Sequence, residues 1–134
     1  MITQGFEGCL VMFPRDVWRE LTGKIQELPF TEPHARLFKR FFLTPALEVS
    51  IDRVGRVTLA DFHRQAASID REVVFNGMGD HLEIWAPAVW KKYRAENAGR
   101  YEAVAASLLE SAAAQRRERE AGRREGAEDD REGP

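Results

Sequence analysis

The chain has little cysteine, no long apolar run and no excess of one charge, and each shortage excludes a class of protein. Its one cysteine, Cys9, excludes an internal disulfide framework and a cysteine-rich zinc site. No run of eighteen apolar residues exists that could form a transmembrane helix. The 20 basic and 22 acidic residues leave a net charge of −2, so any nucleic-acid binding must use a local patch. With 134 residues in all, one compact domain or two very small ones are expected.

The residues that often carry catalysis are scarce and scattered. His34, His63 and His81 lie on separate predicted elements, without the spacing of a metal-binding pair. Cys9 lies in an apolar stretch without a basic neighbour to activate it, which indicates a buried thiol. The glycine-rich stretch Gly77-Met-Gly79 lacks the lysine and the third glycine of a phosphate-binding loop. The sequence therefore predicts no enzyme, no metal, no cofactor and no small-molecule substrate.

An internal duplication is present. The segment 4–21 aligns with 76–93 at a constant offset of 72, without gaps. Four aligned pairs are identical, namely Gly5/Gly77, Leu10/Leu82, Val17/Val89 and Trp18/Trp90. Each copy predicts a turn, a short strand (9–13 and 81–85), and a helix that begins at a proline. Val17 and Trp18, like their equivalents, are expected in the core.

The second copy has an upstream half that the first copy lacks. Residues 48–59 alternate apolar and polar positions around a polar turn and predict a β-hairpin. A short helix with Asp61 at its start and a strand over 72–75 are expected to follow. The equivalent of Asp52–Arg56 in the first copy would lie about twenty residues before Met1. Either the duplication is partial, or the chain lacks its natural N-terminus; the second interpretation is favoured.

The duplication and the composition together divide the chain into five predicted segments. Residues 1–30 are the remnant of a first repeat, 31–45 a connecting helix, and 46–98 a second repeat. Residues 99–114 keep helical apolar spacing and predict a C-terminal helix. Residues 115–134 carry no apolar side chain larger than alanine, so a disordered charged tail is expected there.

The turn Asp52-Arg53-Val54-Gly55-Arg56 is the sharpest local feature. The Asp52 carboxylate can accept hydrogen bonds from turn N–H groups, and Gly55 tolerates a positive φ. Arg53 and Arg56 would then lie at an exposed tip, where they can reach phosphates or a guanine edge. Arg64 projects from the short helix that follows. From spacing alone, a solvated hairpin tip without a ligand remains the alternative.

Four stretches together resemble the MraZ family of bacterial transcriptional regulators, in the AbrB/SpoVT superfamily. They are residues 3–10, 35–42, 52–56 and 82–90. The family is marked by an Asp-x-x-x-Arg turn in each of two repeats, which Asp52 and Arg56 match in the second.

The resemblance implies an α+β fold, namely a swapped-hairpin, double-ψ-like β-barrel of two AbrB-like repeats with peripheral helices. It implies homo-oligomeric rings that bind promoter direct repeats in double-stranded DNA of the division and cell-wall gene cluster, usually as a repressor. Arg53, Arg56 and Arg64 would contact DNA, Asp52 and Gly55 would shape the turn, and the protein would be cytoplasmic and nucleoid-associated. The alternative is an oligomeric protein-interaction module without specific DNA binding, because the first repeat is incomplete.

Overall fold

The protein is described here from a computed structural model, which covers the backbone of residues 1–129 and the side chains of residues 1–123. The chain divides into two units, Met1–Tyr93 and a second that begins at Arg94. The first unit contains all four strands of an antiparallel sheet. None of the described helices is both long and apolar enough to cross a membrane.

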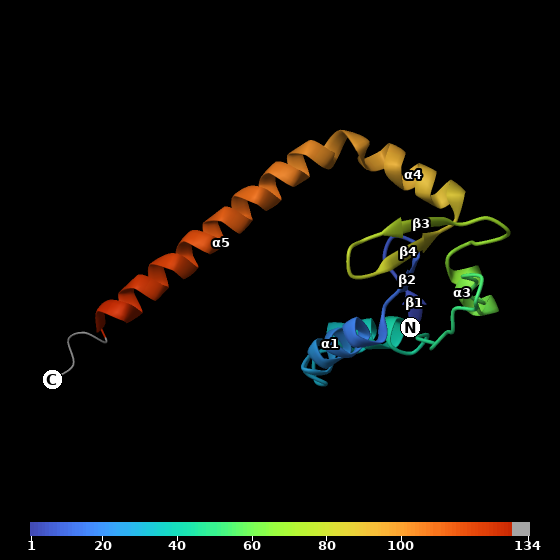
Figure 1. Ribbon diagram of the computed structural model, residues 1–134, viewed down its shortest axis with the longest axis horizontal. Helices are drawn as coiled ribbons and strands as arrows, with labels where there is room; N and C mark the ends of the chain where they lie inside the picture. Colours follow the sequence, from blue (N-terminus) through green and yellow to red (C-terminus); the bar gives the residue numbers. More distant parts are fainter. Residues whose placement is uncertain (130–134) are drawn as a thin grey trace. The chain divides into compact units, whose positions relative to one another are not determined.

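The sheet is open, with the strand order β1-β2-β4-β3 (Figure 1). The strands are β1 (Ile2–Gln4), β2 (Leu10–Met12), β3 (Val74–Gly77) and β4 (Leu82–Trp85). The two inner strands are the two that the duplication predicts. Strand β1 was not predicted, and the predicted strand over 72–75 lies two residues further along. The coarse fold class, α+β, is confirmed, whereas the described residues form a sheet that does not close into a barrel.

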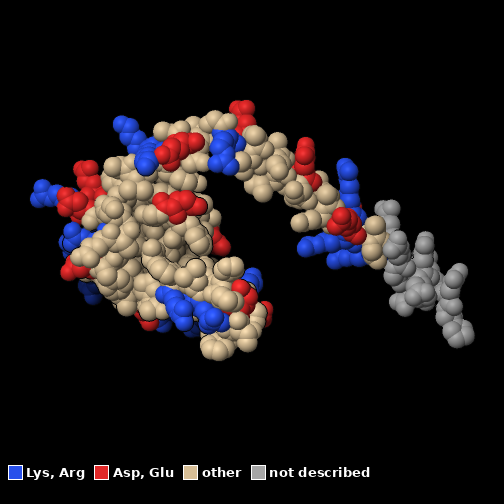
Figure 2. All heavy atoms as spheres, turned by 180° about the vertical axis from the view of Figure 1, so that it is seen from behind, with Lys and Arg blue, Asp and Glu red and all other residues tan. Residues whose placement is uncertain are grey.

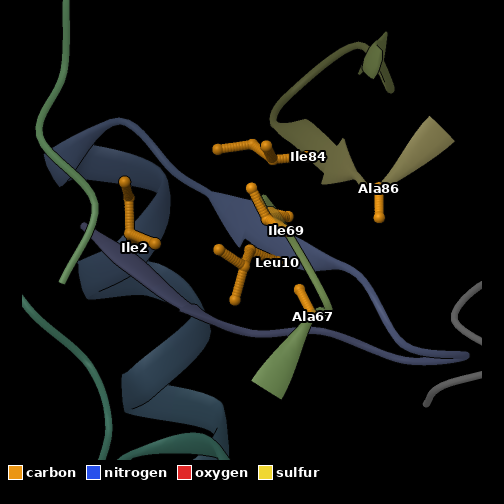
Figure 3. Packing of buried hydrophobic residues seen from close by; sticks show 6 residues of the cluster. All are labelled: Ile2, Leu10, Ala67, Ile69, Ile84 and Ala86. Carbon is orange, nitrogen blue, oxygen red and sulfur yellow. The ribbon is translucent and has the colours of Figure 1, made fainter. Parts of the chain in front are cut away.

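Each face of the sheet carries its own core cluster, because successive side chains of a strand point to opposite faces. One cluster gathers residues from β1, β2 and β4 and from the segment after α3 (Asp61–Ala66). Figure 3 shows its six members, which are Ile2, Leu10, Ala67, Ile69, Ile84 and Ala86. The other cluster comprises Cys9, Val11, Phe13, Ile25, Phe42 and Trp85. Each fully buried aliphatic side chain contributes about 1.5–3 kcal/mol to folding.

Helices α1 (Arg15–Gln26) and α2 (Pro33–Phe42) cover the second face. Helix α1 begins after Pro14 and places Asp16 in its first turn and Lys24 in its last, which suits the helix dipole. The N-cap of α2 is Glu32. Its carboxylate accepts a hydrogen bond from the Ala35 amide at 2.6 Å, and Pro33 occupies the first turn.

The predicted β-hairpin over 48–59 does not form the backbone hydrogen bonds of a paired strand along its two arms. Residues 48–51 and 57–60 are not assigned to strands, and the turn between them is closed by the Asp52 N–H bonded to the Arg56 carbonyl oxygen at 2.9 Å. The segment before the turn bonds elsewhere, because Leu47 and Ile2 exchange two backbone hydrogen bonds of 2.8 and 2.9 Å. The apolar side chains of these arms, Val49, Val57 and Leu59, pack on the first core cluster. Burial rather than strand pairing therefore holds the arms.

The second unit contains the end of α4 (Pro87–Asn97), a 3-10 turn (Ala98–Arg100) and α5 (Tyr101–Asp129). Helix α5 continues beyond residue 114, through the segment for which the sequence predicts disorder. Alanine, arginine and glutamate favour helix, and Arg116 pairs with Glu120 one turn later at 3.2 Å. The remainder of that predicted tail, residues 130–134, lies outside the described residues.

Candidate nucleic-acid interface

The side chain of Asp52 organises the turn at residues 52–56. Its Oδ1 atom accepts hydrogen bonds from the Val54 amide at 3.0 Å and the Arg56 amide at 2.8 Å. The Gly55 amide bonds to the Asp52 carbonyl oxygen at 3.0 Å, and Gly55 has a φ of +81°. No atom lies within 4 Å of a Cβ placed on Gly55, so the backbone angle alone calls for glycine. The result is a tight turn with one carboxylate at its centre.

The same carboxylate fixes the direction of the Arg56 side chain. Arg56 Nε donates to Asp52 Oδ2 at 2.8 Å, which forms an exposed ion pair within the turn. The hydrogen bond from the Arg56 amide, followed by that from its side chain, lowers the pKa of the Asp52 carboxyl below its ordinary value of 3.8. Arg56 Nη1 and Nη2 form no further hydrogen bond within the described part of the chain. They remain available for a bidentate contact with a ligand.

The turn is anchored to the sheet on its N-terminal side. Leu47 bridges to β1 through Ile2, as described above. Glu48 forms an ion pair with Arg15, the first residue of α1. These contacts attach the start of the arm both to the sheet edge and to a helix, so the turn projects from a fixed base.

The three arginines that the sequence analysis identifies lie on two different elements and differ in their partners. Arg53 and Arg56 share the turn, and Arg53 is exposed. Arg64 lies on α3, where Nη2 bonds to the Asp70 carbonyl oxygen at 3.3 Å and Nη1 lies 3.8 Å from Asp61 Oδ1. The Asp61 contact is an i,i+3 pair that sequence spacing could have indicated. Arg64 therefore also ties α3 to the loop that follows it.

Charge elsewhere on the first unit does not form a broad basic face. Figure 2 shows acidic and basic side chains interspersed on the visible face, with a wide uncharged area between them. This matches the equal count of 12 basic and 12 acidic residues in the first unit, residues 1–93. Any attraction for an anion on this face must therefore come from individual arginines.

The histidines and Cys9 form no catalytic set among the residues that the structure describes. His63 is buried and its Nε2 lies 2.7 Å from the Pro45 carbonyl oxygen, whereas His34 is exposed and His81 pairs with Asp80 at 2.6 Å. Cys9 is buried, and burial, followed by the charge of Glu83, raises the pKa of its thiol to about 11. Over the described range, no group of three or more His, Cys, Asp or Glu residues could hold a metal ion.

The duplicated strand–helix unit, the shared sheet and the Asp-x-x-x-Arg turn define an α+β protein of two related repeats. A family model described as "MraZ protein, putative antitoxin-like" matches residues 1–41 and 42–116 in two segments. The chain belongs to the MraZ family.

Curated relatives support this assignment over most of their length. A protein from Heliobacterium modesticaldum is 39% identical over 108 residues, covering 81% of this chain and 76% of the relative. One from Moorella thermoacetica is 39% identical over 110 residues, with 82% and 77% coverage. One from Desulfitobacterium hafniense is 38% identical over 107 residues, with 80% and 75% coverage. Each of the three is named "Transcriptional regulator MraZ".

Proposed function

We propose that the protein is a transcriptional regulator that binds double-stranded DNA through the turn at residues 52–56. The observation that carries this proposal is the Asp52–Arg56 ion pair, which holds an exposed guanidinium at the tip of a fixed turn. The names of its relatives support the regulatory role. The target is the promoter of the division and cell-wall gene cluster, and the protein acts there as a repressor associated with the nucleoid.

Arginine suits this role because its planar guanidinium donates two parallel hydrogen bonds to a phosphate or to the O6 and N7 atoms of guanine. With Nε held by Asp52, the Nη atoms of Arg56 are directed before DNA arrives, which lowers the entropy lost on binding. Arg53 adds a second cation to the same turn, and Arg64 on α3 adds a phosphate contact.

One turn offers too few cations for tight binding, so the proposal includes a homo-oligomer. Several copies arranged in a ring would present their turns to successive direct repeats, and the linked contacts would multiply the affinity. The closed, swapped-hairpin barrel that the family resemblance implies belongs to the same proposal.

A protein-interaction module without specific DNA binding is the second candidate. Helix α5 favours it, because large apolar side chains are exposed along it, namely Tyr101, Val104, Leu108 and Leu109. Such side chains are typical of a helix that packs against a partner.

The test is fluorescence anisotropy with a labelled duplex of direct repeats from the protein's own promoter, beside a shuffled duplex, at two salt concentrations. The regulator should prefer the repeats and bind more weakly as salt rises. Arg56→Ala should weaken binding at least tenfold, since the loss repeats in every copy of the oligomer. Arg19→Ala, which removes an exposed arginine from α1, is the matched control and should change little.

The outcomes separate the two candidates. Equal binding to both duplexes, or none, together with a stable oligomer in sedimentation, would favour the interaction module. Specific binding that Arg56→Ala leaves intact would retain the regulator but remove this turn from the interface.

A further inference from the structure

A second feature of the first unit lies away from the arginine turn, in a hollow of about 430 Å³ beside β3 and β4. Its walls come from the turn between β1 and β2, from the two strands and from the start of α4. Its lining includes Glu7, Asn76, Glu83, Trp85, Trp90 and Tyr93. The set combines aromatic rings with acidic side chains, and no described lysine or arginine is among it.

Three aromatic rings in the wall are packed together. The ring centroids of Trp85 and Trp90 are 5.2 Å apart, those of Trp85 and Tyr93 are 5.3 Å apart, and those of Trp90 and Tyr93 are 6.1 Å apart. Mutual contact of this kind holds the rings in place. Aromatic faces attract organic cations, and tryptophan attracts them most.

Two carboxylates make the hollow acidic. Glu83 accepts a hydrogen bond from Trp85 Nε1 at 2.8 Å, and Glu7 lies on the β1–β2 turn. Neither glutamate forms an ion pair with any residue that the structure describes. Their field reaches the neighbouring Cys9, because the charges of Glu83 and Glu7 act after burial to raise the pKa of its thiol. Two carboxylates thus concentrate negative charge in the wall of the hollow.

Asn76 adds an unsatisfied polar group. It lies directly opposite Glu83 in the β3–β4 pair, so both side chains project from the same face of the sheet. Its Nδ2 atom is buried and has no hydrogen-bond partner. A buried carboxamide without a partner is rare, and rotation of the amide by 180° exchanges its nitrogen for its oxygen at this position.

We propose that this hollow binds the guanidinium group of an arginine, from a free small molecule or from a peptide. A guanidinium is planar and stacks on indole and phenol rings, here those of the half-buried Trp90 and Tyr93, while its five N–H groups can bond to the two carboxylates. This chemistry is opposite in sign to that of the arginine turn, which recognises anions. The hollow therefore serves a partner other than DNA.

The first experiment uses NMR titration of the full chain with two nearly isosteric ligands, N-acetyl-arginine amide and its neutral analogue N-acetyl-citrulline amide. The indole N–H signals of Trp85 and Trp90 should shift with the arginine ligand and not with the citrulline ligand. Trp18 packs against Phe13 and Phe42 in the second core cluster and does not line the hollow, so its signal serves as an internal control. Equal shifts with both ligands, or none with either, would overturn the proposal.

The second experiment removes one charge at a time. Glu83→Gln keeps an acceptor for Trp85 Nε1, and it should weaken arginine binding about two- to fivefold, as should Glu7→Gln. Glu27→Gln removes an exposed carboxylate at the end of α1 and is the matched control, with unchanged binding expected. Binding that survives both hollow variants unchanged would exclude the hollow as the site.

A further arm distinguishes the source of the group. A short serine peptide with one central arginine is titrated beside N-acetyl-arginine amide. Tighter binding of the peptide would assign the hollow to a protein partner, and equal or weaker binding would assign it to a small molecule. Either result supports the guanidinium site.

Discussion

Val11 lies directly opposite Glu83 across the β2–β4 pair, and the two residues are also equivalent in the duplication, whose offset is 72 residues. On either side of them the equivalents exchange places, with Leu10 opposite Ile84 and Met12 opposite Leu82. A pseudo-twofold axis therefore passes between Val11 and Glu83, and the two repeats meet along their equivalent strands.

The pair Leu10 and Ile84 should be energetically coupled across this axis. Both side chains are almost fully buried in the first core cluster. We expect Leu10→Ala and Ile84→Ala each to lower the free energy of unfolding by about 2–5 kcal/mol. The double variant should depart from the sum of the single effects by at least about 0.5 kcal/mol. Urea denaturation of the four proteins measures this, and strict additivity would contradict direct packing of the pair.

Two glycines should respond to alanine in opposite ways. A Cβ on Gly5 would lie 2.8 Å from Cys9 Sγ and 2.9 Å from Val11 Cγ1, so Gly5→Ala should destabilise the fold by about 1–3 kcal/mol. A Cβ on Gly23, within α1, meets no atom within 4 Å. Gly23→Ala should therefore stabilise by up to about 1 kcal/mol, because alanine favours helix. Thermal melts of both variants test the prediction, which a gain for Gly5→Ala would refute.

The Cys9 thiol should make stability fall at alkaline pH. The unfolded thiol ionises near its ordinary value of 9.0, whereas the folded thiol resists ionisation until about 11. Its contribution is therefore complete below pH 9 and is lost as pH rises toward 11. Between pH 8 and 10.5, wild type should lose about 1–2 kcal/mol more unfolding free energy than Cys9→Ala. Parallel losses in urea titrations of the two proteins would show that the thiol is not responsible.

The turn at residues 52–56 should open in acid. Hydrogen bonds to the carboxylate lower the pKa of Asp52 in the folded chain. They therefore stabilise the turn above the ordinary value of 3.8, and this stabilisation is lost as pH falls through the lower folded value. The NMR signals of the Arg56 amide and Nε–H should report this opening. In Asp52→Asn the same signals should show no such transition, and a transition there would point to another group.

Elements set by local chemistry could be predicted from the sequence. The inner strands and the helices after Pro14 and Pro87 follow from the duplication, and the Asp52 turn follows from an aspartate and a glycine three residues apart. Strand β1 could not be predicted, because its three residues are held by Leu10–Met12 and Leu47, which are distant in the sequence. The predicted hairpin arms are fixed by burial, and alternation alone does not reveal which backbone groups will pair.

The same reasoning separates the two sites. The arginine turn depends on residues within five positions of one another, so the sequence can indicate it. The acidic hollow depends on the register that sets Asn76 against Glu83 and on a turn at Glu7 some seventy residues earlier. The one signal in the sequence was Glu83, a glutamate within the apolar strand β4. It does not show which residues will lie beside it until the strands are paired.

The axis between Val11 and Glu83 limits which residues can stand at this position. Two identical subunits joined as β2 and β4 are joined here would place the same residue on both sides of the axis. Glutamate in both would set like charges directly opposite each other, which destabilises a strand pair. The strand pair avoids this repulsion here, because one copy carries valine where the other carries glutamate. The single carboxylate that Glu83 gives to the hollow therefore belongs to an asymmetric pair, which two identical strands could not form.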